Sequence, residues 1–451
     1  MDQGFQGRRR SSVFGARACF AFLACGCVSL TLGIAGASVN AAPVFAPMTN
    51  YVIDEPSSIA IGDLNGDRKP DLATASDIES TVTVLINKGG GRFRSLHHVG
   101  LGAGIPYSVA IGDLNGDGKQ DLATADAGAD SVSVLLNQGG GTFQRRRDYA
   151  TAEGPESVAL GDLNGDKKAD LVTEADNNVS VLLNTGDGSF PAHVDYLVGT
   201  GLSSVAIGDL NSDGHPDLAA VTAPANVSVL INRGDGSFAG PFDYATWKGP
   251  LSIAIGDLND DGKPDLVTAG DSTVSILLND GQGSSFARRD YRVGGTPESV
   301  AIGDLSGDQE PDLAIAPFFN DRLAVLVNIG KGGFGRPTTY RTESTARDLA
   351  IGDLNGDRKE DLVSANTDEE PATLSVLLNA TGLCGVPHVR GRPLPAARLA
   401  IARAGCRVGG VRRGYSATVR LGRVISETPR PGTVLRKGAK VNLVVSRGRK
   451  R

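Results

Sequence analysis

Oxygen-bearing side chains recur in this chain at a spacing that suits a hard metal cation. The copy at 113–121 places Asp113, Asn115, Asp117 and Asp121 at its first, third, fifth and ninth positions. Calcium takes roughly six to eight oxygen ligands in a flexible cage, whereas magnesium demands strict octahedral geometry and keeps its waters. The same 1-3-5 spacing opens the calcium loop of helical calcium sensors, and the main-chain carbonyl of position 7 is a further donor. The pattern therefore predicts a calcium loop.

The pattern occurs seven times, at spacings of 50, 49, 47, 48, 47 and 49 residues. We call the nine-residue copies loops 1 to 7 in chain order, and we expect them to hold up to seven calcium ions. The predicted metal ligands, at positions 1, 3, 5 and 9 of each loop, are Asp63, Asn65, Asp67, Asp71; Asp113, Asn115, Asp117, Asp121; Asp162, Asn164, Asp166, Asp170; Asp209, Asn211, Asp213, Asp217; Asp257, Asn259, Asp261, Asp265; Asp304, Ser306, Asp308, Asp312; and Asp353, Asn355, Asp357, Asp361.

Charge supports a metal in these loops. Residues 43–382 contain 24 basic and 49 acidic residues, and 21 of the acids are the loop aspartates. Three carboxylates held close together repel one another strongly without a cation. The alternative is a metal-free turn rich in Asp and Asn, since both residues favour turns. Seven copies with one oxygen pattern favour the metal.

The loops are not expected to be equal. Position 6 suits Gly because the chain turns sharply there, and Gly occupies it only in loops 2, 4 and 5. Loop 6 also has Ser306 where the others have Asn. We predict that loop 6 is the weakest site.

Short strands must position these loops. In the second repeat, strand-like runs cover 108–114, 121–125 and 132–137, and a fourth run ends near Tyr149, with turn residues between them. Each loop therefore joins the first two strands of its repeat. Four strands in each of seven units predict an all-β fold, a seven-bladed β-propeller. The last repeat lacks a fourth strand, and 45–52 matches one, so we expect the N-terminal strand to complete the last blade and close the ring.

The repeated Gly-Asp-Leu-Asn-Gly-Asp loop, followed by a Gly-x-Phe turn, resembles the FG-GAP (VCBS) repeats of integrin α-subunit propellers and their bacterial relatives. The resemblance covers about 44–380. It implies a seven-bladed propeller with calcium in hairpin loops, used in integrins as a ligand-binding head. Integrin ligand recognition needs a partner subunit that nothing here supplies, so we do not expect that activity.

The composition changes after Gly382. Residues 383–451 contain 17 Lys and Arg residues and one acid, Glu427. The stretch 394–405 is Ala-rich and helix-like, and strand-like runs follow at 418–426 and 441–446. Val386-Pro387, the lead into the helix and the turn at 429–432 resemble a single PASTA domain, the small module of penicillin-binding proteins and bacterial Ser/Thr kinases. The resemblance implies a helix on a small sheet and affinity for peptidoglycan.

We predict four segments. Residues 1–42, with Arg8 to Arg10 and Arg17 before an apolar run, read as a signal peptide. An uncleaved membrane anchor and lipoprotein attachment at Cys25 or Cys27 are the alternatives. The propeller covers 43–382, the PASTA-like domain 383–448, and a basic tail 449–451. Cys384 and Cys406, the cysteines beyond the export segment, are expected to form a disulfide, with free thiols as the alternative.

The sequence shows no catalytic constellation: the five histidines have no zinc-type spacing, and there is no nucleophile elbow. We therefore expect a secreted or cell-surface bacterial protein without enzymatic activity, which acts in adhesion or ligand binding. The predicted partners are peptidoglycan or an anionic cell-wall polymer at 383–448 and a protein or glycan at the propeller, not nucleic acid. A membrane is expected only if the N-terminal segment stays uncleaved. The alternative function is a carbohydrate-active enzyme or lectin that uses the central face of the propeller.

Overall fold

The computed structural model describes residues 41–449, apart from 284, 285, 319, 368–370, 382 and 437. Apart from its last two residues, the predicted export segment lies outside this part. The chain forms two compact units, one at 47–378 and one that joins 43–46 to 379–451. Within the described residues, no helix has the length and apolar character needed to cross a membrane.

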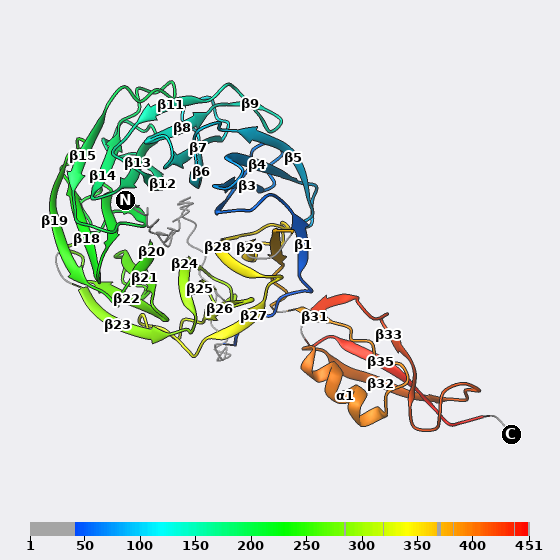
Figure 1. The fold of residues 1–451 in the computed structure, drawn as a ribbon. Coiled ribbons are helices and arrows are strands. Elements are labelled where there is room, and N and C mark those ends of the chain that lie inside the picture. The colour runs from blue at the N-terminus through cyan, green and yellow to red at the C-terminus, as the bar shows by residue number, and fades with distance from the viewer. Residues whose placement is uncertain are drawn as a thin grey trace, which may run out of the picture. The chain divides into compact units, whose positions relative to one another are not determined.

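The first unit contains seven four-stranded antiparallel sheets arranged around a central axis (Figure 1). These are the seven blades predicted from the repeat. The first four blades consist of β2 (Ser58–Gly62), β3 (Asp71–Ser76), β4 (Thr81–Asn87) and β5 (Phe93–Gly100); β6 (Pro106–Gly112), β7 (Asp121–Asp126), β8 (Ser131–Leu135) and β11 (Arg147–Ala150), with the short hairpin β9 (Asn137–Gly139) and β10 (Thr142–Phe143); β12 (Pro155–Gly161), β13 (Asp170–Ala175), β14 (Asn178–Leu182) and β15 (His193–Leu197); and β16 (Val205–Gly208), β17 (Asp217–Thr222), β18 (Asn226–Asn232) and β19 (Phe238–Ala245).

The last blade closes the ring. Strand β1 (Thr49–Val52) pairs antiparallel with β30, and Thr49 lies opposite Val376. The N-terminal strand therefore completes blade 7, as predicted, and two exposed sheet edges are removed. Blades 5 to 7 consist of β20 (Pro250–Gly256), β21 (Asp265–Gly270), β22 (Thr273–Asn279) and β23 (Phe286–Arg292); β24 (Thr296–Gly303), β25 (Asp312–Phe318), β26 (Arg322–Leu326) and β27 (Thr338–Arg341); and β28 (Thr345–Gly352), β29 (Asp361–Thr367), β30 (Thr373–Leu377) and β1.

Apolar side chains from neighbouring blades interleave to form the core. At the closing seam, Ile59 and Leu72 of blade 1 belong to one buried cluster with Leu354, Val363 and Leu374 of blade 7. Each fully buried side chain of this kind contributes about 1.5–3 kcal/mol. The seam between the first and last blades is thus packed with the same kind of side chains as the other seams.

The glycine that ends each first strand lets the next blade approach closely. A Cβ on Gly256 would lie 3.1 Å from Cδ1 of Ile302, and one on Gly352 would lie 3.2 Å from Cδ1 of Ile61. These distances are tighter than ordinary van der Waals contact, so a larger residue would push the neighbouring blade away.

The second unit has one helix and a small sheet. Its elements are α1 (Leu394–Arg403), a three-stranded sheet of β32 (Arg407–Gly414), β35 (Lys440–Ser446) and β33 (Val424–Thr428), and a pair formed by β31 (Leu383–Gly385) and β34 (Val434–Arg436). Val389 and Ile401 pack with Leu443 in its core. The predicted helix is confirmed, and it stops at Arg403, before Gly405 at φ +74°.

The prediction of a strand over 418–426 is wrong in its first half. The Ser416 hydroxyl accepts the N–H groups of Thr418 and Val419 at 3.3 and 2.9 Å, which holds this segment in a turn until β33 begins at Val424. The sequence reading also missed β32, which pairs in parallel with β35.

Cys406 is buried and disulfide-bonded. Its predicted partner, Cys384, lies in strand β31, but its side chain is outside the described residues. The pairing of these two cysteines therefore stays a prediction.

Candidate metal sites in the Asp-rich loops

Each Asp-rich loop connects the first and second strands of its blade. Loop 1 follows β2, which ends at Gly62, and its ninth residue, Asp71, begins β3. The same arrangement holds in all seven blades. The loops therefore all lie at the same end of their blades, as the repeat predicted.

The position-9 aspartates anchor the loops to the sheets. Asp71 is fully buried; its Oδ2 accepts the N–H of Leu64 at 3.0 Å and its Oδ1 accepts the N–H of Asn87 at 2.7 Å. Burial raises the pKa of Asp71 to about 6, against the opposing effect of these two N–H donors. Both oxygens of this carboxylate are thus engaged by the main chain, so position 9 has a structural role.

The position-1 aspartates organise the curl of the loop. Asp113 Oδ1 accepts the N–H groups of Gly116 and Asp117 at 2.8 and 3.2 Å, and Oδ2 accepts that of Gly118 at 2.8 Å. In every loop the position-1 carboxylate accepts the N–H groups of positions 5 and 6.

The sharp turn predicted at position 6 is present in all seven loops. Positions 4 and 6 both have positive φ in each loop, even where the residue is not glycine, as at Ser212 (61°) and Arg358 (66°). Such a conformation costs a residue with a side chain roughly 1–2 kcal/mol. The hydrogen bonds to the position-1 carboxylate offset this cost.

Positions 3 and 5 complete the chain of hydrogen bonds. Asn115 Oδ1 accepts the N–H of Asp117 at 2.9 Å, and Asp117 Oδ1 accepts the N–H of Lys119 at 2.9 Å. The Lys119 ammonium also donates to Asp117 Oδ2 at 2.7 Å, and this hydrogen bond lowers the pKa of Asp117. A cationic side chain thus already contacts one predicted metal ligand.

Loop 6 differs from the others at its entry. The N–H of Ser306, at position 3, donates to Asp312 at 2.8 Å, whereas in the other six loops the donor is the Leu at position 2. The Ser306 hydroxyl is buried and has no hydrogen-bond partner among the described residues. This difference is in line with the predicted weakness of loop 6, which remains a prediction.

A side chain that the sequence reading missed connects loops 1 to 5 and loop 7 to the next blade. Asn137, which begins β9 just after the third strand of blade 2, donates from Nδ2 to the carbonyl oxygens of Leu64 in loop 1 and Gln120 in loop 2, at 2.8 and 2.7 Å. The signal was available, because an Asn stands at this position in all seven repeats. These residues are Asn87, Asn137, Asn184, Asn232, Asn279, Asn328 and Asn379.

The chemistry of the donors fits calcium, because positions 1, 3 and 5 supply only carboxylate, amide and hydroxyl oxygens. An oxygen that accepts one N–H keeps a second lone pair for a metal. The side chains are, however, turned toward the N–H groups of their own loops. Within the described part of the chain, no group of three His, Cys, Asp or Glu side chains is placed to hold a metal ion. Calcium would therefore be held by oxygens at positions 1, 3 and 5, and the position-9 carboxylate, whose oxygens each accept one main-chain N–H in loop 2, stays a predicted ligand.

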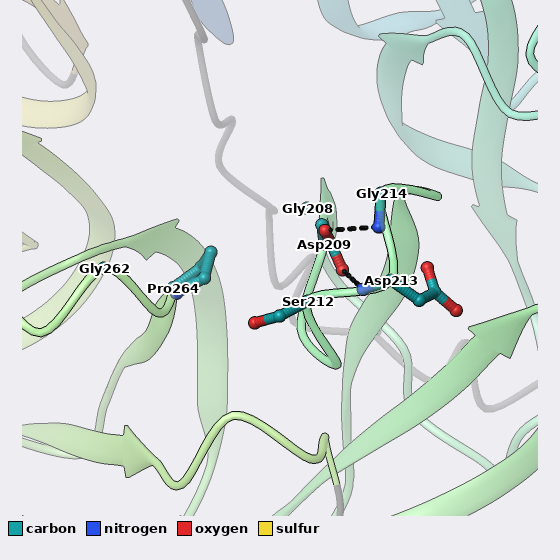
Figure 2. Close-up of a pocket in the computed structure, with 7 residues that line it drawn as sticks. All are labelled: Gly208, Asp209, Ser212, Asp213, Gly214, Gly262 and Pro264. Atoms are coloured by element: carbon teal, nitrogen blue, oxygen red, sulfur yellow. Dashed lines mark hydrogen bonds between the residues drawn. The ribbon is translucent and has the colours of Figure 1, made fainter.

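The loops of blades 4 and 5 border an open pocket of about 510 Å³. Asp209, Ser212 and Asp213 line it from loop 4, and Gly262 and Pro264 from loop 5 (Figure 2). In Figure 2, the Asp209 carboxylate accepts the N–H groups of Asp213 and Gly214, at 3.1 and 2.8 Å.

Two protein-family models match the chain. A model described as an FG-GAP-like repeat matches six segments, 63–124, 113–173, 171–220, 209–268, 257–315 and 304–364. Most of these begin at the first Asp of a loop and run through the next loop, so six matches span the seven loops. The clusters of Asp and Asn in the blades are of the kind typical of calcium sites in such repeats. The second model, the PASTA domain, matches 385–447.

The chain is similar to a kinase over a short stretch and to solved structures over most of its length. A probable serine/threonine-protein kinase of Clostridium acetobutylicum is 44% identical over 63 residues, which are 14% of this chain and 10% of the kinase. The chain thus spans about a tenth of that relative. A chain in the crystal structure of BBS1N in complex with ARL6DN aligns over 75% of this chain and 98% of its own length, with TM-score 0.56 and 10% identity, which shows a shared fold. A structure of an Agrocybe aegerita lectin that recognises non-reducing terminal N-acetylglucosamine aligns over 63% of this chain and 80% of its own, with TM-score 0.46 and 22% identity.

Proposed function

Because the chain belongs to the FG-GAP-like repeat family and ends in a PASTA domain, we propose that it is an exported, non-enzymatic binding protein of the bacterial cell surface. The propeller, stiffened by calcium in its Asp-rich loops, presents a ligand-binding surface. The PASTA domain attaches it to peptidoglycan. The observation that carries the attachment is a guanidinium-lined depression in the PASTA domain.

This depression has a volume of about 330 Å³ and lies beside the turn between β32 and β33. It is lined by Gly391, Thr418, Val419, Arg420 and Arg423. Two guanidinium groups in one depression suit an anionic group, since the planar fork of Arg matches a carboxylate with two parallel hydrogen bonds.

The two arginines differ in whether a hydrogen bond already holds the guanidinium group in place. Arg423 donates from Nη1 to the carbonyl oxygen of Gly391 at 2.8 Å, which fixes its guanidinium while other N–H groups remain available. Arg420 is exposed, and its guanidinium makes no hydrogen bond or ion pair within the described residues. A donor fixed in advance loses less conformational entropy on binding.

The surroundings of the depression favour a polymer that is both anionic and partly apolar. Leu421 and Tyr415, on the same turn, are 74% and 56% exposed. Residues 383–451 contain 17 basic residues and a single acid, so this segment attracts polyanions over several ångströms. We assign the occupant as the carboxylate-bearing peptide stem of peptidoglycan.

Calcium has a stabilising role in this proposal. A cation held by positions 1, 3 and 5 relieves the repulsion between carboxylates in each loop. A ligand that binds the folded state alone also raises the free energy of unfolding. The oxygen-only donor set, repeated in seven blades, supports this part of the proposal.

Co-sedimentation of the purified full chain with peptidoglycan sacculi tests the attachment. We expect the protein to pellet with the sacculi, and Arg420→Ala to lower the bound fraction several-fold. Arg398→Ala removes the same charge from the exposed face of α1 and is the matched control, which should bind as the unmodified chain does. Equal binding by all three proteins would refute the assigned depression, and no binding by the unmodified chain would refute the attachment itself.

A further inference from the structure

The loops differ in charge at position 7, which lies two residues after the position-5 carboxylate. Five loops have a lysine there, loop 4 has a histidine and loop 6 a glutamate. In loop order the residues are Lys69, Lys119, Lys168, His215, Lys263, Glu310 and Lys359.

In four consecutive blades around the closed ring, the lysine pairs with the position-5 aspartate. The ammonium-to-carboxylate distances are 3.8 Å in loop 7, 2.7 Å in loop 1, 2.7 Å in loop 2 and 3.1 Å in loop 3. In loops 1 and 2 the ammonium hydrogen-bonds a carboxylate that a metal would need. In loops 3 and 7 it lies within ion-pair distance and adds a positive charge beside the site, and the Lys168 ammonium also donates to the carbonyl oxygen of Thr185 at 3.1 Å.

In the other three blades, no ammonium contacts the position-5 carboxylate within the described residues. The Lys263 ammonium of loop 5 instead donates to the carbonyl oxygen of Asp280 at 2.6 Å. In loop 4, the ring of His215 lies against Gly234, where an added Cβ would approach Nε2 to 2.9 Å. Asp213 Oδ2 accepts only the side-chain amide of Asn211, at 2.9 Å.

The cavities between neighbouring loops differ in the same way, because lysines line one of them and not the other. The cavity between loops 4 and 5 is lined by Asp209 and Asp213 and by no basic side chain. The cavity between loops 2 and 3, of about 460 Å³, is lined by Asp113 and Asp162 but also by Lys167 and Lys168. Lysine side chains therefore line the space between loops 2 and 3, whereas the space between loops 4 and 5 is open to cations.

We infer that the position-7 lysines act as built-in counter-ions in blades 7, 1, 2 and 3, and that loops 4 and 5 are the preferred calcium sites of the propeller. This inference rests on the proposed calcium function and adds which sites fill first. Loop 6 also lacks the ammonium, but Ser306 replaces its amide donor, so we do not place it among the preferred sites.

The expected difference in calcium affinity follows from the solvent exposure of the Lys–Asp ion pairs. The Lys119 and Asp117 side chains are 43% and 35% exposed, and an exposed ion pair shifts an equilibrium by a few-fold. We expect calcium to bind loop 4 about two- to fivefold more tightly than loop 2. Loop 2 is the matched comparison, because both loops have Asn at position 3 and Gly at position 6.

Equilibrium dialysis of the full chain against radioactive calcium tests this order. At a calcium concentration that fills about two sites per chain, Asp213→Asn should remove about half of one bound ion, and Asp117→Asn about a fifth. His215→Lys should lower the bound calcium, and Lys119→Met should raise it. Lys248→Met, outside the loops, is the control and should change nothing.

The possible results separate the ranking from the calcium function. Equal losses for Asp213→Asn and Asp117→Asn at limiting calcium would overturn the ranking. At saturating calcium the two variants should each lose one ion, which shows that both loops bind. If the unmodified chain binds no calcium, the proposed calcium function fails, whatever the lysines do. Thermal unfolding in excess chelator confirms that each variant is folded.

Discussion

The side-chain amide of Asn87 donates to the carbonyl oxygen of Leu354, 2.7 Å away and 267 residues further along the chain. The bond joins the third strand of blade 1 to the Asp-rich loop of blade 7. The same bond joins Asn137 to Leu64 and Asn184 to Leu114, at 2.8 Å in both cases. The closing seam therefore uses the contact that the repeat uses between consecutive blades.

Removal of this hydrogen bond should lower the free energy of unfolding by as much at the closing seam as at the seam between blades 1 and 2. Asn87→Ala leaves the buried carbonyl group of Leu354 and the partly buried one of Pro70 without this donor, at about 1–3 kcal/mol for each buried unsatisfied group. Asn137→Ala makes the same change between blades 1 and 2 and is the matched control. We expect equal losses in the free energy of unfolding, measured by denaturant titration. A much smaller loss for Asn87→Ala would show that the ring is loosely closed.

The closing seam also contains a buried ion pair. Arg347 of blade 7 binds Asp77 of blade 1 through both guanidinium Nη atoms, at 3.1 and 3.0 Å, and their side chains are 9% and 7% exposed. Arg347→Ala should destabilise the propeller by about 3–5 kcal/mol, because it leaves a buried carboxylate unpaired. Lys168→Ala breaks the exposed pair with Asp166 and should cost less than about 1 kcal/mol. Similar losses for the two variants would contradict the role of the buried pair.

One buried and one partly buried glutamate in blade 3 predict a pH dependence. Burial raises the pKa of Glu156 to about 7 and that of Glu174 well above its ordinary value. The folded state thus binds protons more tightly than the unfolded state. Their contribution to stability is complete at pH values below the unfolded pKa, and it is lost as the pH rises through the raised pKa values of the folded state.

Glu174→Gln should therefore raise the thermal midpoint at pH 8 and change it much less at pH 5. The substitution is informative because Glu174 Oε1 is buried and has no hydrogen-bond partner within the described residues. An amide occupies the same volume without a charge. A variant that is less stable than the unmodified chain at pH 8 would show that the charged carboxylate is favoured in the fold.

Loop 6 offers a gain-of-function prediction. Ser306→Asn restores the amide oxygen that the other loops have at position 3, so it should increase the calcium bound at a limiting concentration. Ser212→Asn in loop 4 is the control, since position 4 has φ 61° and Asn tolerates that conformation. Unchanged calcium binding by Ser306→Asn would show that position 3 does not contribute to the site.

The periodic part of the fold was predictable from the sequence. The Asp at position 9 starts a strand, the Gly before position 1 ends one, and both recur at every repeat, so the blades and the closure by β1 followed. The second unit was harder because β32 contains Gly409, Gly410, Arg412 and Arg413, which hide its strand character. Its pairing with β35 is a tertiary contact that local sequence does not encode.

The site was predictable in composition but not in arrangement. The spacing of Asp and Asn identified the loops, yet it did not show that Asp71 uses both oxygens on N–H groups of Leu64 and Asn87. Nor did it show that Lys119 reaches Asp117 while Lys263 turns to a carbonyl group. Those outcomes depend on which partners the neighbouring turn brings within reach.

Calcium-dependent stability tests the central claim most directly. The midpoint of thermal unfolding of the full chain is measured in excess chelator and in millimolar calcium, together with the number of ions bound per chain. Each site saturated at about 100 times its dissociation constant adds about 2.7 kcal/mol to the free energy of unfolding. We predict that calcium raises the midpoint by several degrees and that several ions bind to each chain. An unchanged midpoint with no calcium bound would contradict the account.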